Sequence, residues 1–172
     1  VALGYQPVLT FHPGSQSKEP QVYVRHIEAA SRIAKLSGAK IGTLNVGGGF
    51  PANYPLSKAQ PLEIFFHTIR ETVLRVFGED HVPALECEPG RGLVATSMSL
   101  LTRIKLVCTD GDDIFINDGV YGGLMEFMQA PELQPPYRVI RDGQVVDGPT
   151  KSWKVFGPTC DPLDVLPTKL DL

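Results

Sequence analysis

The sequence predicts an α/β protein with two parts: a partial (β/α)8 barrel over residues 1–91 and part of a mostly antiparallel β-domain over residues 92–172. The first observation is a set of apolar runs at 7–11, 41–46 and 83–87, which are typical of buried strands. The motifs that follow these runs are about 35 to 40 residues apart, the length of one strand–helix unit in such a barrel. The second is a change after residue 91 to β-prone segments broken by turn signals.

Amphipathic helices are predicted between the three strands. Residues 19–36 repeat apolar side chains in steps of four, three and four, and Gly38 is placed to end this helix. A second helix is predicted over 57–77, where Ser57 and Gln60 resemble a capping box. Its apolar stripe consists of Leu62, Phe65, Ile69, Val73 and Val76.

The second part of the chain is predicted to be rich in strands. Residues 93–108, 113–117 and 137–146 are β-prone, and Asp-Gly pairs at 110–111, 118–119 and 142–143 are turn signals between or within them. No helix is predicted among these segments, so a separate β-domain is the simplest interpretation.

Composition excludes several classes of protein. The net charge is −3 with no basic stripe, so nucleic acid is not an expected partner. No apolar run approaches the roughly 20 residues that span a bilayer, and no secretory signal opens the chain. The three cysteines (Cys87, Cys108 and Cys160) are an odd number without C-x-x-C spacing, which predicts neither a disulfide framework nor a metal site. A reducing, cytoplasmic location is expected.

The chain is expected to be a piece of a longer protein. It has no initiator Met, residues 1–5 read as the end of a helix closed by Gly4, and three strand–helix units cannot close an eight-unit barrel.

Chemically useful groups follow all three predicted strands, in the motifs 11–15 (FHPGS), 46–50 (VGGGF) and 88–91 (EPGR). The carboxyl ends of parallel barrel strands lie on one face, where active sites are found. The bare backbone of Gly47–Gly49 can present N–H groups to an anion, and the guanidinium of Arg91 suits a phosphate. With the Ser15 hydroxyl nearby, these groups predict a phosphate site at the strand ends.

Two further residues have both a structural and a functional interpretation. Strand alternation places Glu86 and Glu88 on one face of a buried strand, where carboxylates need partners. Either Arg91 and backbone donors satisfy them, or Glu88 faces the basic nitrogen of a ligand. His12 is either a hydrogen-bonded structural histidine or an imidazole stacked on the aromatic ring of a cofactor.

The motif at 157–164 (GPTCDPLD) lies in a turn-rich segment. Cys160 can be a loop thiol that transfers a proton, with Asp161 close enough to bind a cationic group. The alternative is a capped turn with an incidental cysteine.

In this order, and together with 117–122 (NDGVYG), the motifs resemble those of the ornithine decarboxylase-like group of fold-type III pyridoxal 5′-phosphate (PLP) decarboxylases. The resemblance covers essentially the whole chain. The Cys160-Asp161 pair is closer to the form in ornithine and lysine decarboxylases than to that in diaminopimelate decarboxylases. The implied activity is decarboxylation of a basic L-amino acid, ornithine or lysine, to a diamine in polyamine biosynthesis.

The resemblance also implies a role for each site residue. His12 stacks on the pyridine ring and Glu88 pairs with its nitrogen. In the implied homodimer, Cys160 donates a proton in the partner's active site, Asp161 contacts the distal amine of the substrate, and Tyr121 lies near the interface. The phosphate of PLP is implied to be held by Ser15, Gly47, Gly48, Gly49, Gly90 and Arg91.

The Schiff-base lysine of the family lies upstream of these motifs, and no lysine of this chain matches its context, so the chain as given is expected to be inactive. Other hypotheses remain open: a non-catalytic homologue acting as a regulatory binding protein, or a decarboxylase for diaminopimelate, arginine or carboxynorspermidine. An amino-acid racemase of the same fold type is disfavoured by Glu88, since those enzymes generally place an arginine opposite the ring nitrogen.

Overall fold

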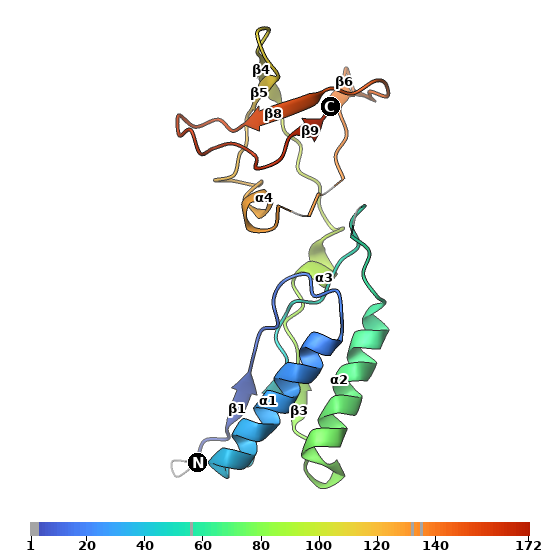
Figure 1. The fold of residues 1–172 in the computed structure, drawn as a ribbon, viewed down its shortest axis with the longest axis vertical. Helices are drawn as coiled ribbons and strands as arrows, with labels where there is room; N and C mark the ends of the chain where they lie inside the picture. The colour runs from blue at the N-terminus through green and yellow to red at the C-terminus, as the bar shows by residue number, and fades with distance from the viewer. Residues whose placement is uncertain (1–3, 56, 132, 135) are drawn as a thin grey trace. The chain divides into compact units, whose positions relative to one another are not determined.

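A computed structural model gives the fold of the 172-residue chain and describes residues 4–55, 57–131, 133–134 and 136–172 (Figure 1). The chain forms two compact units. Unit 1 comprises Val1–Asn53 and Lys58–Met98, and unit 2 comprises Tyr54–Ser57 and Ser99–Leu172. The helix end predicted at 1–5 falls mostly on residues 1–3, outside the described part of the chain.

Unit 1 contains a parallel three-stranded sheet in the order β1-β2-β3. Its strands are β1 (Val8–Thr10), β2 (Thr43–Asn45) and β3 (Ala84–Glu86), each inside one of the predicted apolar runs. Thr10 is in register with Asn45, and Asn45 with Glu86. The α/β prediction and the parallel pairing of the three strands are therefore confirmed.

Two long helices connect the strands. Helix α1 (Gln21–Ser37) buries its predicted apolar face and ends at Gly38, which adopts a left-handed φ of 65°. Helix α2 (Leu62–Phe77) is followed by the 3-10 helix η1 (Glu79–His81). The predicted helix start at Ser57 is wrong, because Pro61 is extended with a ψ of 142° and disfavours helix in the residue before it. Among the described residues no side chain caps α2, and Gln60 instead donates to Glu19 at 2.9 Å.

The core of unit 1 lies between the sheet and these helices. Leu44 and Val46 are almost fully buried with Tyr23, Phe50 and Phe65. Because side chains alternate along a strand, residues 43, 45 and 47 face the opposite side of the sheet. This opposite face carries Thr43 and Asn45 of β2 and Gly47, which follows the strand.

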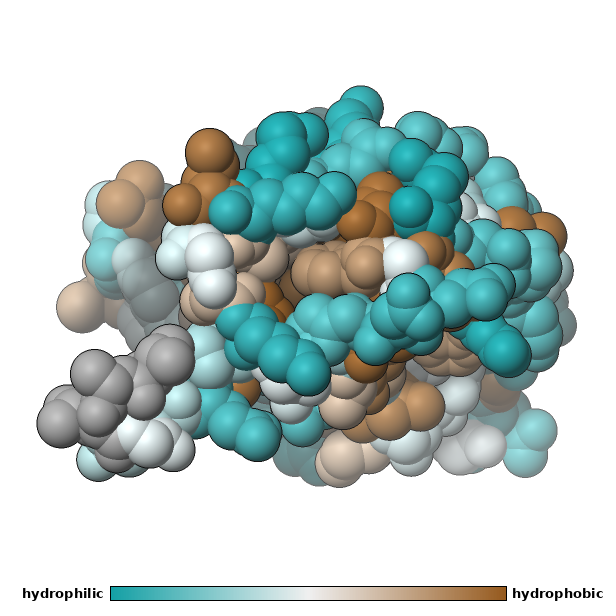
Figure 2. Space-filling model, turned by 90° about the horizontal axis from the view of Figure 1, so that it is seen from below, coloured by the Kyte–Doolittle hydropathy of each residue, from teal (hydrophilic) through white to brown (hydrophobic). Residues whose placement is uncertain are grey.

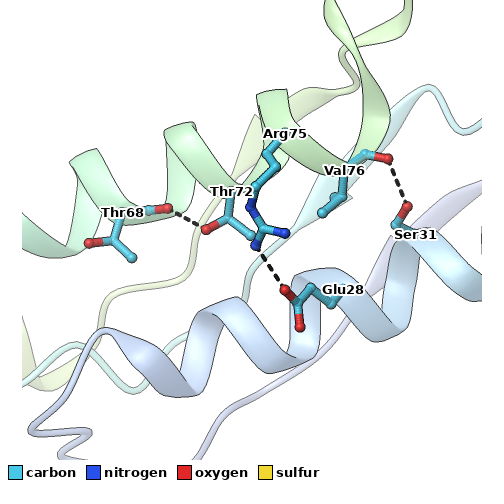
Figure 3. A network of polar contacts seen from close by, with 6 residues as sticks. All are labelled: Glu28, Ser31, Thr68, Thr72, Arg75 and Val76. Carbon is cyan, nitrogen blue, oxygen red and sulfur yellow. Dashed lines mark hydrogen bonds and ion pairs between the residues drawn. The ribbon is translucent and has the colours of Figure 1, made fainter.

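Polar contacts supplement the packing of α1 on α2 (Figure 3). The Arg75 guanidinium lies 2.8 Å from the Glu28 carboxylate, and the Ser31 hydroxyl donates to the Val76 carbonyl at 3.1 Å. An exposed ion pair contributes little, so the buried apolar stripe stabilises this helix pair far more.

Apolar side chains also remain exposed on unit 1. Val8 on β1 and Leu85 on β3 are 56% and 42% exposed, and all three residues of β3 are exposed. The view from below in Figure 2 shows apolar surface enclosed by hydrophilic residues. The two outer strands of this sheet are thus less covered than β2.

Unit 2 is built on a four-stranded sheet in the order β4-β5-β8-β9, with a separate hairpin of β6 (Ile140–Arg141) and β7 (Gln144–Val145). The sheet strands are β4 (Ile104–Val107), β5 (Asp113–Ile116), β8 (Ser152–Phe156) and β9 (Leu170–Asp171). The pairs β4–β5, β8–β9 and β6–β7 are antiparallel, but β5 and β8 are parallel. The β-domain is therefore present, with one parallel pairing that the sequence did not predict.

After residue 91, the structure differs from the predictions in two places and adds two strands that were not predicted. Residues 93–103 contain no strand, and the one-turn helix α3 (Arg91–Val94) occupies their start. A second short helix, α4 (Glu126–Gln129), lies where none was predicted. Strands β8 and β9 were not predicted, although β8 supplies Val155 to the core of unit 2. No helix in the described part of the chain is long and apolar enough to cross a membrane.

Candidate active site

The carboxyl ends of all three strands of unit 1 lie beside one another. His12 follows β1, the glycine turn Gly47–Gly49 follows β2 and Glu88 follows β3. Backbone hydrogen bonds continue the parallel pairing past the strands, from the Val46 N–H to Glu86 at 2.9 Å and from the Glu88 N–H to Gly47 at 2.8 Å. The structure therefore brings together three of the motifs that the sequence singled out.

The glycine turn is packed too closely for any larger residue. A Cβ on Gly48 would lie 2.8 Å from the Glu88 carbonyl oxygen and 3.1 Å from His12 Nε2. Gly47 and Gly49 have φ values of 68° and 86°, in the region that favours glycine. The middle glycine is thus the point at which the imidazole, the turn and the Glu88 backbone meet.

Hydrogen bonds hold the Gly47 N–H and the Gly48 carbonyl of this turn, and they leave the N–H groups of Gly48 and Gly49 available. The Gly47 N–H donates to Asn45 Oδ1 at 2.8 Å, and the Gly48 carbonyl accepts from the buried Tyr23 hydroxyl at 2.8 Å. Burial, and secondarily the charge of Cys87, raises the pKa of the Tyr23 phenol, so this hydroxyl remains a donor. Within the described residues, the amides of Gly48 and Gly49 donate no hydrogen bond. Two such neighbouring amides can bind an anion.

The loop after β1 is held against the turn by Gln16. This buried residue has a left-handed φ of 54°, and its side-chain amide both donates to and accepts from the Ala52 backbone, at 2.6 and 3.0 Å. The Ser17 N–H also donates to the Gly49 carbonyl at 2.9 Å. Ser15 lies at the exposed tip of this loop, where its hydroxyl is open to a ligand.

The two candidate ring-binding residues are both exposed on unit 1. His12 Nδ1 accepts the Gly14 N–H at 3.0 Å, which leaves the proton of a neutral imidazole on Nε2. Glu88 Oε1 accepts a hydrogen bond from Asn45 Nδ2 at 2.7 Å. Gly90 and Arg91 follow, with Gly90 as the N-cap of α3 and Arg91 as its first residue.

The candidate residues of unit 2 lie on one turn. Cys160 is exposed, and the Asp161 carboxylate accepts the Leu163 N–H at 2.8 Å and the Tyr121 hydroxyl at 2.7 Å. The hydrogen bond from the Leu163 N–H, and after it the bond from Tyr121, lowers the pKa of Asp161. The hydrogen bond to Asp161 also raises the pKa of the Tyr121 hydroxyl. The arrangement holds Asp161 as an anion that can pair with a cationic group.

A buried carboxylate anchors this turn. Asp164 is 1% exposed and accepts hydrogen bonds from the Val120 N–H at 3.0 Å, the Thr159 N–H at 3.1 Å and the Thr159 hydroxyl at 2.7 Å. Asp164 thereby joins the loop that carries Tyr121 to the loop that carries Cys160.

Sequence reasoning missed three residues of these two sites: Asn45, Tyr23 and Asp164. An asparagine two residues before the first glycine is a signal for an Asx-turn and could have indicated Asn45. Tyr23 belongs to the apolar repeat of the helix predicted over 19–36, which indicates burial and no site role, and Asp164 has no pattern that separates it from an ordinary turn residue. Within the part of the chain that the structure describes, no three His, Cys, Asp or Glu side chains form a group that could hold a metal ion.

Parallel strands joined by helices, with a glycine turn and charged groups at their carboxyl ends, form part of a cofactor-binding α/β barrel. Residues 8–95, half of the chain, match the family described as pyridoxal-dependent decarboxylase, pyridoxal binding domain. The chain therefore belongs to the pyridoxal-dependent decarboxylase family, as the motifs implied.

Relatives of known function agree with this assignment. The chain is 30% identical to the chloroplastic ornithine decarboxylase of Nicotiana glutinosa over 169 residues, which cover 92% of the chain and 38% of that protein. The solved lysine/ornithine decarboxylase of Vibrio vulnificus with cadaverine is 27% identical, with a TM-score of 0.72, over 95% of this chain and 44% of that one. The arginine decarboxylase of Paramecium bursaria Chlorella virus with agmatine is 26% identical, with a TM-score of 0.74, over 99% and 46%.

The chain thus spans less than half the length of these relatives. The fold prediction of a partial PLP-binding barrel followed by part of a β-domain is confirmed by the same structural similarity.

Proposed function

We propose that unit 1 binds PLP at its three strand ends. The amides of Gly48 and Gly49, Arg91, Gly90 and the Ser15 hydroxyl hold the phosphate, His12 lies against the pyridine ring, and Glu88 accepts the hydrogen of the ring nitrogen. When bound, PLP supplies an electron-withdrawing ring that stabilises the charge left on the substrate's α-carbon when CO₂ departs.

The observation that supports this proposal is the position of Gly48. Gly48 packs against His12, whose Nε2 would lie 3.1 Å from a Cβ at this position. The Gly48 carbonyl is held by Tyr23, while its amide donates to no other described residue. An anion donor site, an imidazole and a carboxylate therefore fit the phosphate, ring and ring nitrogen of one molecule.

We propose further that a protein containing this chain decarboxylates a basic L-amino acid, ornithine or lysine, to a diamine. The relatives named above act on ornithine, lysine and arginine. The anionic Asp161 suits a distal ammonium group, and the exposed Cys160 thiol is the group that protonates the α-carbon. In this proposal the protein is a homodimer in which each copy contributes these two residues to the other's site. The polyamine role and the cytoplasmic location remain predictions.

Cofactor binding can be tested on the 172-residue chain without any lysine chemistry. We expect the chain to bind pyridoxine 5′-phosphate at least about tenfold more tightly than pyridoxine, a factor that corresponds to ~1.4 kcal/mol. Arg91→Ala should remove most of this preference. Arg75→Ala is the matched control, because Arg75 pairs with Glu28 on the helices. Equal affinity for the two ligands would refute the proposed phosphate site.

Activity requires a separate test. The chain alone should form no borohydride-fixed adduct between PLP and a lysine, and a longer polypeptide that contains it should convert ornithine or lysine to the diamine. Product analysis with ornithine, lysine and arginine distinguishes the substrates. If agmatine is the main product, the substrate is arginine and not ornithine or lysine.

A further inference from the structure

We propose that Asn45 is a positioning residue that couples the phosphate-binding turn to the carboxylate facing the ring nitrogen. This inference rests on the proposed PLP site of unit 1. Asn45 was not among the candidate residues of the sequence, and it touches neither the phosphate nor the ring in the proposed arrangement. It acts through Gly47 and Glu88.

The geometry of the Asn45 side chain carries this inference. Its Nδ2 donates to Glu88 Oε1 at 2.7 Å, and its Oδ1 accepts the Gly47 N–H at 2.8 Å. The two partners come from different strand ends, 41 positions apart in the printed sequence. One amide therefore bridges the turn after β2 and the carboxylate after β3.

The two ends of an amide have opposite polarity, and this fixes its orientation. A flip of the Asn45 side chain would point its NH₂ group at the Gly47 N–H and its oxygen at the Glu88 carboxylate, so both hydrogen bonds would be lost. The side chain has one satisfactory orientation, and that orientation determines where Glu88 Oε1 lies.

Glu88 needs such a restraint because it is exposed and its side chain has several rotatable bonds. Among the described residues, Asn45 is the one group whose hydrogen bond to the Glu88 side chain holds it in place. Oε1 accepts from Asn45, whereas Oε2 accepts no hydrogen bond from the described residues and can accept from the ring nitrogen. Restraining a long side chain before the ligand arrives reduces the entropy lost on binding. Asn45 thus sets the spacing between the phosphate site and the ring-nitrogen site.

Asn45→Ser separates the two hydrogen bonds. A serine hydroxyl can still accept the N–H two residues on, as in an ST-turn, so the glycine turn is kept. The hydroxyl is too short to reach Glu88. Asn45→Ala removes both contacts. Asn53→Ser is the matched control, because the exposed Asn53 accepts the Ala59 N–H in the same unit and contacts neither Gly47 nor Glu88.

The probe is pyridoxine 5′-phosphate, titrated into the 172-residue chain and followed by calorimetry. We expect Asn45→Ser to weaken binding about tenfold, a factor equivalent to ~1.4 kcal/mol, with Asn53→Ser within about twofold of the unmodified chain. In a Glu88→Ala background, Asn45→Ser should change the affinity less than about twofold, because the residue through which it acts is gone. The ¹⁵N chemical shift of the labelled ring nitrogen should move toward the neutral form in Asn45→Ser.

Additive effects of Asn45→Ser and Glu88→Ala would overturn the inference, as would an Asn45→Ser chain that binds like Asn53→Ser. If Asn45→Ser does not fold, Asn45→Thr replaces it, because its hydroxyl also accepts the Gly47 N–H and a β-branched side chain suits a strand. The ¹⁵N shift and affinity are then compared between Glu88→Ala and Glu88→Ala/Asn45→Thr, where a difference above about fivefold contradicts action through Glu88. Failure of the proposed function gives a different result, since the unmodified chain would then show no preference for the phosphorylated ligand.

Discussion

Replacing the buried Asp164 with asparagine should destabilise unit 2 strongly. The carboxylate receives three hydrogen bonds, two of them at Oδ2 from Thr159 and one at Oδ1 from the Val120 N–H. If the asparagine oxygen keeps the Thr159 bonds, its NH₂ group faces the Val120 N–H, and two donors confront each other. The flipped orientation would keep the Val120 bond but turn the NH₂ group toward the Thr159 N–H, so either orientation places two donors against each other.

The magnitude follows from these contacts. Leaving one buried donor unsatisfied costs about 1–3 kcal/mol, and bonds to a charged acceptor are worth about 1 kcal/mol more than bonds to a neutral one. Removing the buried charge offsets part of this loss. We expect Asp164→Asn to lower the free energy of unfolding of unit 2 by about 2–4 kcal/mol.

Trp153 provides the assay. It is the single tryptophan of the chain, it lies on β8, and it packs against the core of unit 2. Urea unfolding followed by its fluorescence therefore reports on unit 2. Asp112→Asn is the control, because Asp112 is exposed and paired with Lys151 at 2.7 Å. The reasoning is refuted if Asp164→Asn shifts the midpoint no more than Asp112→Asn does.

Two further predictions concern single contacts. Gly48→Ala should destabilise unit 1 by about 1–3 kcal/mol and weaken pyridoxine 5′-phosphate binding by at least about tenfold, since the new Cβ meets the Glu88 carbonyl. Thermal unfolding and titration test this, with Gly148→Ala as a control in open space; wild-type binding would contradict it. Tyr121→Phe should raise the pKa of Asp161, because the second of its two hydrogen-bond donors is removed. The stabilisation from Asp161 is present above its unfolded pKa and is lost as pH falls through the lowered folded pKa, so the variant should lose it at higher pH. Carboxyl ¹³C titration measures the shift, and an unchanged midpoint would contradict the role of Tyr121.

The sequence predicted those parts of the fold that depend on local periodicity. The three strands of unit 1 and the helix over α1 follow from apolar spacing, and the left-handed Gly38 ends that helix as expected. Helix α2 begins at Leu62 and not at Ser57, because the extended Pro61 overrides the capping pattern at Ser57. Strand β8 was missed because it is defined by pairing with β5, a partner distant in the chain.

The candidate site likewise contains residues that local sequence patterns indicate and residues that only the three-dimensional structure reveals. The glycines and Glu88 could be recognised from their place after strands, and the structure brings His12 and Gly48 together as predicted. The side chains that hold this arrangement could not be recognised in the same way. Tyr23 and Asn45 belong to a regular helix and a regular strand, and their hydrogen bonds exist only after the strands have aligned. Their roles depend on three-dimensional neighbours that no spacing rule encodes.

The parallel sheet of unit 1 has two open edges. Among the described strands, β1 and β3 each pair on one side only, so their outer backbone N–H and C=O groups form a template for another strand. Val8 and Leu85 add exposed apolar surface to these edges. A chain with unpaired edge strands and exposed apolar side chains is prone to edge-to-edge aggregation at high concentration. The protein should therefore be kept dilute, and a ligand that stabilises it should be added early. A segment that paired with β1 or with β3 would remove the liability at that edge.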